Sequence, residues 1–303
     1  MPETIVLKGE HGLPYSKGLM AQSLSASGLA PDRAYEVARA LEARLADLGR
    51  PTIEVNALRE LAAAAVREHE GDDAARRFLD WEGLDRLERP LIVMLGGAPG
   101  VGKSTLATLL AGRVGITRVI ATDAIRNVIR AFFSHDFMPV VHYSSFEAGA
   151  IVDPDEVGDG DPDLVGYLRQ VASIRTGVVA IAERAIQERT PMILEGVHLV
   201  PGTLDGSVPG AIEGSLRQDS TLVEAVIAIE DEEAHRSHFS LRGSGRPATR
   251  YLRRFEQIRK LQGLLVERAR ARGVPVIDAT NLDAAVAEGM DIVRAKVSAA
   301  PSG

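Results

Sequence analysis

Residues 97–105 read Gly-Ala-Pro-Gly-Val-Gly-Lys-Ser-Thr, and this stretch decides the fold. It matches the pattern G-x-x-x-x-G-K-[ST], which is typical of a P-loop. Its glycines allow successive backbone N–H groups to turn towards an anion, while Lys103 is expected to contact the β- and γ-phosphates and Ser104 to bind Mg²⁺. The predicted nucleotide-binding residues are Gly97, Ala98, Pro99, Gly100, Val101, Gly102, Lys103, Ser104 and Thr105.

The residues on either side of this loop support the prediction. Leu91–Leu95 is a short apolar run of the kind found in buried parallel strands. Leu106–Ala111 is rich in residues that favour a helix. A strand, a glycine-rich loop and a helix in this order place a phosphate group at the N-terminus of the helix.

Apolar runs continue to alternate with helical stretches after the loop. Further strands are expected at Arg118–Ala121, Met192–Leu194, Val223–Ile229 and Val274–Ile277, and long helices at Val165–Glu188 and Ala248–Ala271. This alternation predicts an α/β domain over residues 89–303, a P-loop NTPase with a parallel sheet and helices on both faces.

The first 88 residues have a different pattern, which predicts a small α-rich domain. Ile5–Leu7 is a candidate strand that opens the segment, alone or as part of a hairpin. Helices are expected from Pro31 to a stop at Gly49, from Asn56 as the cap to near Gly71, and from Asp73 to Trp81. Residues 84–90 are the expected linker to the second domain.

Composition excludes several classes of protein. The 303 residues include no cysteine, which rules out disulfides, thiolate metal sites and a cysteine nucleophile. The formal net charge of −7 disfavours nucleic acid and anionic membranes as partners of the whole molecule. No apolar run approaches the length of a membrane span, and the N-terminus lacks the apolar core of a signal peptide. We therefore expect a cytoplasmic protein, and a homo-oligomer stays open.

Two acids follow predicted strands and are candidates for chemistry. Asp123 ends the run Val119-Ile120-Ala121-Thr122-Asp123, where it can orient or deprotonate an acceptor hydroxyl or bind Mg²⁺. Arg126 and Arg130 follow at helical spacing and would face an anionic substrate. A plain helix cap at Asp123 with a solvated Arg126 is the alternative.

The second acid, Glu195, ends the apolar run Met192–Leu194 in the manner of a Walker B motif. A carboxylate in that position can hold Mg²⁺ through water. His198 follows three residues later, and two roles stay open for it: contact with a substrate phosphate or carboxylate, or a capping role in a loop.

Residues 236–273 carry eleven lysines and arginines against two acids. Arg242-Gly243-Ser244-Gly245-Arg246 is a flexible segment with an arginine at each end, which is typical of a lid that closes over a triphosphate. Arg242 and Arg246 are thus candidate catalytic residues, together with Lys103 and Asp123. An RNA-binding stripe is the alternative, although it would lack the interleaved aromatic residues that stack on bases.

Two loops complete the pattern. Six acids fall within residues 153–163, which we expect to form an exposed loop because their spacing does not fit a Ca²⁺-binding EF-hand. Asn281 stands where a GTPase would have its guanine-binding motif. It either edges an adenine site or caps a loop.

Several of these segments together resemble the 2-phosphoglycerate kinase family, over residues 90–285. The matching segments are Gly97–Thr105, Thr122–Arg126, Met138-Pro139 with His142–Ser145, Glu195–His198 with Pro201-Gly202, and Asp231–Glu233 with the arginine lid. The resemblance implies a kinase that makes 2,3-bisphosphoglycerate from ATP and 2-phosphoglycerate. Residues 1–80 resemble an ATP-cone domain, through Ile5–Leu7 and Pro14–Gly18.

The resemblance also implies a binding site for a small anionic substrate. The candidates for contact with its phosphate and carboxylate are Arg126, Arg130, His142, Ser144, Ser145 and His198. A helix cap is the alternative role for the two serines. The candidates for Mg²⁺ are Ser104, Asp123 and Glu195.

The leading hypothesis is therefore a kinase that uses ATP and Mg²⁺ and phosphorylates a hydroxyl of a small phosphorylated acid. A polynucleotide or tRNA kinase that uses the basic segment is the second hypothesis, and steep salt dependence of binding would mark it. A nucleotide sensor without catalysis is the third. The presence of Lys103, Asp123 and Glu195 argues against an idle site.

Overall fold

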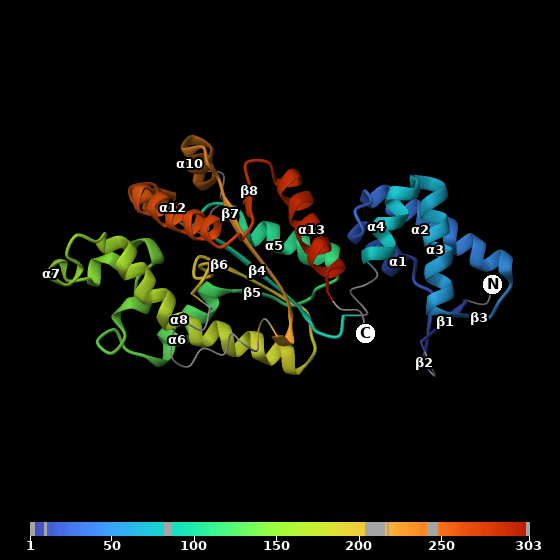
Figure 1. Cartoon of the computed structure of the whole chain (residues 1–303), viewed down its shortest axis with the longest axis horizontal. Coiled ribbons are helices and arrows are strands. Elements are labelled where there is room, and N and C mark those ends of the chain that lie inside the picture. The colour runs from blue at the N-terminus through green and yellow to red at the C-terminus, as the bar shows by residue number, and fades with distance from the viewer. Residues whose placement is uncertain are drawn as a thin grey trace. The chain divides into compact units, whose positions relative to one another are not determined.

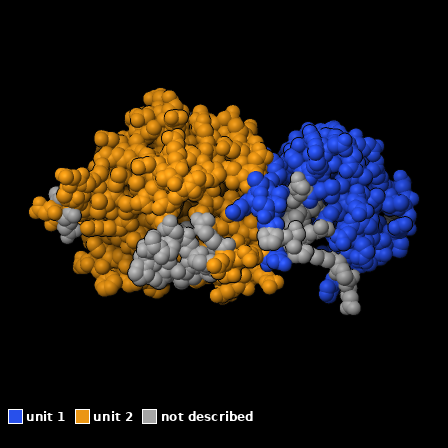
Figure 2. Space-filling model, viewed as in Figure 1, with its two compact units in different colours: residues 1–88, 112–115, 294–303 blue, residues 89–111, 116–293 orange. Residues whose placement is uncertain are grey.

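The computed structural model describes residues 4–8, 11–81, 87–203, 216, 218–240 and 248–300. Its internal contacts divide the chain into two compact units, which Figure 2 colours separately. Unit 1 comprises residues 1–88, 112–115 and 294–303, and unit 2 comprises residues 89–111 and 116–293. The carboxyl-terminal ends of two helices of unit 2 are thus assigned to unit 1.

Unit 1 consists of a small sheet and four helices. The sheet has the order β2-β1-β3, with β2 antiparallel and β3 parallel to β1. The strands are β1 Ile5–Lys8, β2 His11–Pro14 and β3 Thr52–Glu54, and the helices are α1 Lys17–Ala26, α2 Pro31–Leu48, α3 Val55–Glu70 and α4 Asp72–Trp81.

The ends of α2 follow directly from its sequence. Pro31 occupies the first turn, where its fixed φ suits a helix and its missing N–H is not needed. Gly49 ends the helix with a left-handed φ of 60°. The prediction that Asn56 caps the next helix is wrong, because α3 already begins at Val55 with Glu54 before it. No prediction covers helix α1 or strand β3.

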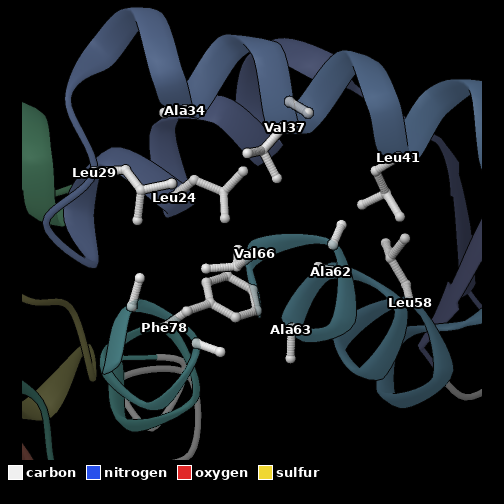
Figure 3. Packing of buried hydrophobic residues seen from close by; sticks show 14 of the residues in the cluster. Leu24, Leu29, Ala34, Val37, Leu41, Leu58, Ala62, Ala63, Val66 and Phe78 are labelled. Atoms are coloured by element: carbon white, nitrogen blue, oxygen red, sulfur yellow. The ribbon is translucent and has the colours of Figure 1, made fainter. Parts of the chain in front are cut away.

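The core of unit 1 is built from large and small apolar side chains in alternation. Figure 3 shows Phe78 of α4 against Val66 of α3, with Leu24, Val37 and Leu41 on the facing helices. Alanines at the helix contacts allow close approach, and they include Ala34, Ala38, Ala62, Ala63, Ala65, Ala74 and Ala75. Four short helices therefore enclose one continuous core.

Unit 2 contains a five-stranded sheet with the order β5-β6-β4-β7-β8, in which all neighbouring strands are parallel. The strands are β4 Leu91–Gly97, β5 Val119–Ala121, β6 Met192–Gly196, β7 Thr221–Ala228 and β8 Val276–Asp278. Strand β4 lies in the centre and is buried along its whole length, as the continuous apolar run predicts. The α/β fold class and all five predicted strands are confirmed, within two residues at their ends.

Helices cover both faces of this sheet (Figure 1). Helix α8 packs its apolar residues, Ile174 and Val178 among them, against Ile92 and Met94 of β4. In Figure 1, α5 and α13 lie on the other side of the sheet from α8 and α12. The helices of unit 2 whose bounds lie within the described residues are α5 Lys103–Val114, α6 Thr122–Phe132, α7 Pro154–Val157, α8 Pro162–Gln187, α10 Glu232–Ser240, α11 Ala248–Arg253, α12 Phe255–Ala271 and α13 Leu282–Ser298.

Two predictions for unit 2 are corrected. The single helix expected over Ala248–Ala271 is two helices, because Arg254 between α11 and α12 leaves helical geometry with φ −114° and ψ 23°. The acidic stretch expected to be a loop includes the short helix α7 and the cap of α8, where Asp161 accepts the N–H of Asp163. Lys260 of α12 lies within 3.0 Å of both Asp161 and Asp163, so part of this negative charge is neutralised within the fold.

No helix in the ranges that the structure describes is both long and apolar enough to cross a membrane.

Two 3-10 helices, η2 Pro139–His142 and η3 Ser145–Ile151, lie between α6 and α7. They carry a small apolar cluster of Val140, Val141 and Ala148. The predicted lid, Arg242–Arg246, falls outside the described residues, as do residues 84–86 of the predicted linker.

We expect Phe78→Ala to lower the free energy of unfolding of unit 1 by about 3–5 kcal/mol, because the substitution leaves a cavity where a fully buried ring packs. Urea denaturation followed by fluorescence of Trp81, the single tryptophan, measures this change. Leu19→Ala is the matched control, since Leu19 is 67% exposed, and it should change the free energy by less than about 0.5 kcal/mol. Equal effects of the two substitutions would contradict this description of the core.

Candidate active site

A cleft lies at the carboxyl ends of β4, β5 and β6. Its lining includes Lys103 and Ser104 at the start of α5, Asp123 and Arg126 in α6, and Glu195 in β6. The cleft encloses about 670 Å³ of space outside the protein atoms, part of it open to solvent. In parallel α/β sheets, ligands bind at this edge, and five predicted site residues from three separate segments meet there.

The turn between β4 and α5 has the backbone geometry that the glycine pattern predicts. Gly100 and Gly102 have φ values of 94° and 86°, which L side chains rarely adopt. A Cβ at residue 100 would also lie 2.3 Å from the ring of Phe239. Lys103 is nearly buried, at 9% exposed, and its Nζ donates to Ala98 O at 2.8 Å, which holds the ammonium over the turn.

Helix α10 supports this turn from outside. His235 Nε2 donates to Pro99 O at 2.9 Å, and His238 Nδ1 lies 3.1 Å from Gly100 O. Arg259 Nη1 donates to Ile229 O at 2.7 Å and lies 3.4 Å from His235 Nδ1. Burial lowers the pKa of His235 to about 4, against the opposing effect of its bond to Pro99, so the ring is neutral at pH 7.

Ser104 and Glu195 form the part of the site that fits a magnesium ion. Ser104 Oγ donates to Glu195 Oε1 at 2.8 Å, and Glu195 is 6% exposed. No group of three or more His, Cys, Asp or Glu suited to a metal occurs among the residues that the structure describes. Mg²⁺ commonly binds one or two carboxylates and completes its shell with water and substrate phosphates, so a hydroxyl and a carboxylate beside a phosphate-binding loop match its needs.

Asp123 lies in the first turn of α6, and Arg126 lies one turn later. Arg126 Nε donates to Asp123 Oδ1 at 3.2 Å, and Arg126 Nη1 donates to Val141 O and Tyr143 O at 3.0 and 3.1 Å. Burial raises the pKa of Asp123, while His198, Arg126 and Lys103 lower it, and the balance holds that pKa below its ordinary value. Asp123 is therefore an ionised hydrogen-bond acceptor at neutral pH and a weak base.

The opposite wall of the cleft comes from η3 and α11. Ser144, Ser145, Phe146 and Tyr251 line it, and the rings of Phe146 and Tyr251 are 5.4 Å apart. Arg250 Nη2 donates to Ser144 Oγ at 3.1 Å, and the same guanidinium is paired with Glu147. Arg250 thus contacts one of the predicted substrate residues, Ser144.

His198 lies beneath the cleft and is 4% exposed. Its Nδ1 is 2.8 Å from Thr122 Oγ1, and its Nε2 is 3.0 Å from Gln170 Oε1. Burial lowers the pKa of His198 to about 3, although the charge of Asp123 opposes this shift. Both ring nitrogens have protein partners, so the structure gives this residue no free nitrogen for a substrate.

Gly196 fixes how closely β6 approaches α6. A Cβ at residue 196 would lie 1.8 Å from Thr122 Oγ1, well inside contact distance. Glycine therefore allows Glu195 at the end of β6 and Asp123 at the start of α6 to face the same cleft.

Two of the predicted substrate residues lie away from the lining of the cleft. Arg130 is exposed on α6, and His142 Nε2 lies 2.9 Å from Phe133 O, so it bonds to the backbone after that helix. Arg242 and Arg246 fall outside the described residues. No prediction covers His235 or Phe239, which support the P-loop. Their signal was the i, i+4 spacing of two aromatic rings in a polar helix.

A second, more apolar cavity lies on the other side of the P-loop. Gly100, Thr105, His238, Thr280 and Leu282 are among its lining residues. Of the two roles left open for Asn281, the structure shows a cap, since Asn281 Oδ1 accepts the N–H of Ala284 at 3.0 Å at the start of α13. Its neighbour Thr280 faces the cavity instead.

The basic residues of segment 236–273 have internal partners at several positions. Lys260 pairs with Asp161 and Asp163, and Arg250 pairs with Glu147. Arg259 donates to backbone carbonyls, and Arg236 lies 4.2 Å above the ring of Phe255. Among the described residues of the segment, these four basic side chains are therefore engaged within the fold.

Curated proteins related to this chain cover almost its whole length. A 2-phosphoglycerate kinase from Methanopyrus kandleri is 34% identical over 300 residues, which are 97% of this chain and 88% of that protein. A 2-phosphoglycerate kinase from Thermococcus kodakarensis is 35% identical over 276 residues, 90% of each chain. No protein-family model matches. A shikimate kinase from Acinetobacter baumannii, solved with shikimate, is 15% identical, with a TM-score of 0.37 over 70% of this chain and 96% of that chain.

We expect the free energy of unfolding of unit 2 to fall by roughly 4 kcal/mol between pH 7 and pH 5, about 2 kcal/mol each from His198 and His235. The pKa values of both rings are lowered in the folded state, to about 3 and about 4. Above pH 6.5 the rings are neutral in both states. Below it, only the unfolded state takes up protons, so stability is lost as the pH falls. Urea titrations followed by circular dichroism measure the slope.

His198→Asn is the control for this prediction. It should lower stability at pH 7 but remove about half of the change between pH 7 and pH 5, because one of the two buried rings is gone. A wild-type stability that is constant from pH 7 to pH 5 would show that neither ring is held neutral.

Proposed function

Because the chain belongs to the 2-phosphoglycerate kinase family, we propose that it transfers the γ-phosphoryl group of ATP to the free hydroxyl of 2-phosphoglycerate. The product is 2,3-bisphosphoglycerate. The relatives carry this name and match nearly the whole chain. The observation that supports the proposal best is the meeting of Lys103, Ser104, Asp123, Arg126 and Glu195 in one cleft at the edge of the sheet.

ATP is proposed to place its phosphates on the turn between β4 and α5. The backbone N–H groups of residue 98 and residues 100–104 and the Lys103 ammonium offer positive charge to them, at the N-terminus of a helix. Lys103 would exchange its bond to Ala98 O for a phosphate oxygen. The apolar cavity beside Gly100 and Thr280 is proposed to take the nucleoside.

Ser104 and Glu195 are proposed to hold Mg²⁺, with Asp123 near it. The ion would supply positive charge that offsets the charge on the transferred phosphoryl group. In this proposal the buried Glu195 carboxylate would hold the ion through water, and the Ser104 hydroxyl, which lies 2.8 Å from that carboxylate, would be its second protein partner.

Asp123 is proposed to orient the acceptor hydroxyl towards the γ-phosphate. Its depressed pKa makes it a weak base, which suits a loose transition state in which positioning matters more than early proton removal. Arg126 is bound through Nε and Nη1 to Asp123 and two backbone carbonyls, and we assign its Nη2 to the anionic acceptor.

Ser144 and Ser145 are proposed to bind the other end of the acceptor, with Arg250 beside them. Among the described residues that line the cleft, two cations, Lys103 and Arg126, stand against two carboxylates. A phosphorylated acid beside a nucleotide triphosphate needs more positive charge than this. Arg250 offers it, and we propose that Arg242 and Arg246 add to it by closing over the phosphates.

The arrangement of the chain fits this assignment of roles. We propose that residues 89–303 form the kinase domain and residues 1–88 an ATP-cone-like domain, and that the enzyme works in the cytoplasm, where ATP is available. A polynucleotide acceptor is disfavoured, because the basic residues that would bind its phosphates, Arg259 and Lys260 among them, are engaged within the fold.

We expect the purified protein to release ADP from MgATP when 2-phosphoglycerate is present. Phosphorylated acids of the same size should give less release, and glycerate and 5′-hydroxyl RNA should give none above the ATP-only rate. The physical reason is that the cleft combines a phosphoryl-transfer site with cations for a second phosphate. A coupled ADP assay measures the rates, and analysis of the product identifies the bisphosphate.

Lys103→Ala and Asp123→Asn are the controls for this assay. Each should lower turnover by at least about a hundredfold, in line with loss of a phosphate contact or a positioning group. Release with RNA ends would support the polynucleotide hypothesis. Tight ATP binding without release for any acceptor would support the sensor hypothesis and overturn this proposal.

We expect Arg250→Gln to raise the KM for the acceptor by about 10- to 100-fold, because a charge-assisted bond is worth about 1.5–3 kcal/mol, while the KM for ATP changes little. Glu147→Gln should change the acceptor KM in the opposite direction and lower it, because the substitution frees Arg250 from its carboxylate partner. Initial-rate kinetics with each substrate varied measure both. Arg253→Gln, exposed in the same helix, should leave both constants unchanged. An unchanged acceptor KM in Arg250→Gln would remove this residue from the site.

A further inference from the structure

Three buried polar side chains form a continuous chain of hydrogen bonds beneath the cleft. Thr122 Oγ1 and His198 Nδ1 are 2.8 Å apart, and His198 Nε2 and Gln170 Oε1 are 3.0 Å apart. Thr122 and Gln170 are 0% exposed, and His198 is 4% exposed. Because unpaired polar atoms at such depth are costly, this chain has a specific arrangement of protons.

The donors and acceptors follow from Gln170. Its Nε2 donates to Val140 O at 2.6 Å and to Tyr143 O at 3.0 Å, which uses both amide hydrogens. Its Oε1 is therefore an acceptor, and His198 Nε2 must carry the hydrogen that it accepts. His198 Nδ1 is then an acceptor, and the Thr122 hydroxyl donates to it. The chain has one direction, and the ring is the Nε2–H tautomer.

The two ends of this chain hold two different parts of the site. Thr122 immediately precedes Asp123 in the first turn of α6. Gln170 of α8 holds residues 140–143, which lead directly into Ser144 and Ser145 of the cleft wall. Arg126 bonds to the same segment, since Tyr143 O accepts from both Arg126 Nη1 and Gln170 Nε2.

We propose that His198 is a positioning residue that fixes the distance and orientation between Asp123 and the acceptor-binding segment 140–145. Its Nε2–H donates to Gln170 and its Nδ1 accepts from Thr122, so the ring links the two segments without contact to the substrate. The proposal rests on the function proposed above and assigns to His198 a task different from the substrate contact expected from the sequence. Rigid support of this kind is what keeps catalytic groups within productive geometry.

The two arms can be tested separately with a matched pair of substitutions. In His198→Asn, the amide oxygen replaces Nδ1 and can still accept from Thr122, while the bond to Gln170 is lost. In His198→Gln, the amide nitrogen replaces Nε2 and can still donate to Gln170, while the bond to Thr122 is lost. We expect His198→Asn to raise the acceptor KM by about tenfold and His198→Gln to lower kcat by about tenfold, with the KM for ATP unchanged in both.

Thr122 provides an independent check on the first arm. Thr122→Val keeps the shape of the side chain and removes its hydroxyl, so it should lower kcat like His198→Gln. Thr122→Ser keeps the hydroxyl and should restore kcat to within about threefold of the wild type. Thermal melting of each variant shows that it is folded under the assay conditions.

A spectroscopic measurement tests the same chain without any acceptor. In ¹⁵N-labelled protein, the His198 ring should show a protonated Nε2 and an unprotonated Nδ1, assigned by the signal missing from His198→Asn. An Nδ1–H tautomer would overturn the proposal, as would kinetic changes that are alike in the two His198 variants or that include the KM for ATP. If the wild type does not use 2-phosphoglycerate, the proposed function fails by itself, and the tautomer still decides the direction of the hydrogen-bond chain.

Discussion

The turn at residues 98–102 is the constraint on which the architecture of unit 2 depends. The backbone must direct successive N–H groups inwards and enter a helix at Lys103, which requires positive φ at Gly100 and Gly102. Without a Cβ at residue 100 the turn has room for Phe239, and α10 can then hold the carbonyls of Pro99 and Gly100 through His235 and His238. Tyr251 of α11 lines the far wall of the cleft. The phosphate side and the acceptor side of the site are thus supported by one aromatic cluster, in which the rings of Phe239 and Tyr251 stack at 5.1 Å.

The sequence predicted the part of the structure that local rules determine. Apolar runs located the five parallel strands of unit 2, and Pro31 and Gly49 marked the ends of α2, because strand burial and the φ preferences of proline and glycine act over a few residues. The acids Asp123 and Glu195 could be placed at the site because the carboxyl ends of parallel strands share one edge of a sheet. The break between α11 and α12 could not be predicted in this way. Arg254 interrupts a helix in a segment that has strong helical pattern throughout, and no local signal marks the break.

Buried polar residues were the hardest to interpret from sequence. His198 follows Glu195 closely, which suggested contact with substrate, yet its partners are Thr122 and Gln170 from segments 76 and 28 residues away. The charge of segment 236–273 was similarly ambiguous, because the acids that pair with Lys260 and Arg250 lie about a hundred residues earlier in the chain. Composition indicates how much charge a segment has. Only the tertiary structure shows how much of that charge remains for a ligand, and in this chain Asp161, Asp163 and Glu147 take a share of it.

The close contact between Gly196 and Thr122 has a consequence for how this protein can vary. The distance between the carboxylates of Glu195 on β6 and Asp123 on α6 depends on the absence of a Cβ at residue 196, because even the methyl group of alanine there would displace Thr122 Oγ1. A residue with no side chain therefore acts as the spacer of the site. Any other residue at position 196 would collide with Thr122 unless β6 and α6 moved apart. To widen the gap between Glu195 and Asp123, for a larger ion or a longer acceptor, a designer would therefore substitute Gly196 and keep both acids.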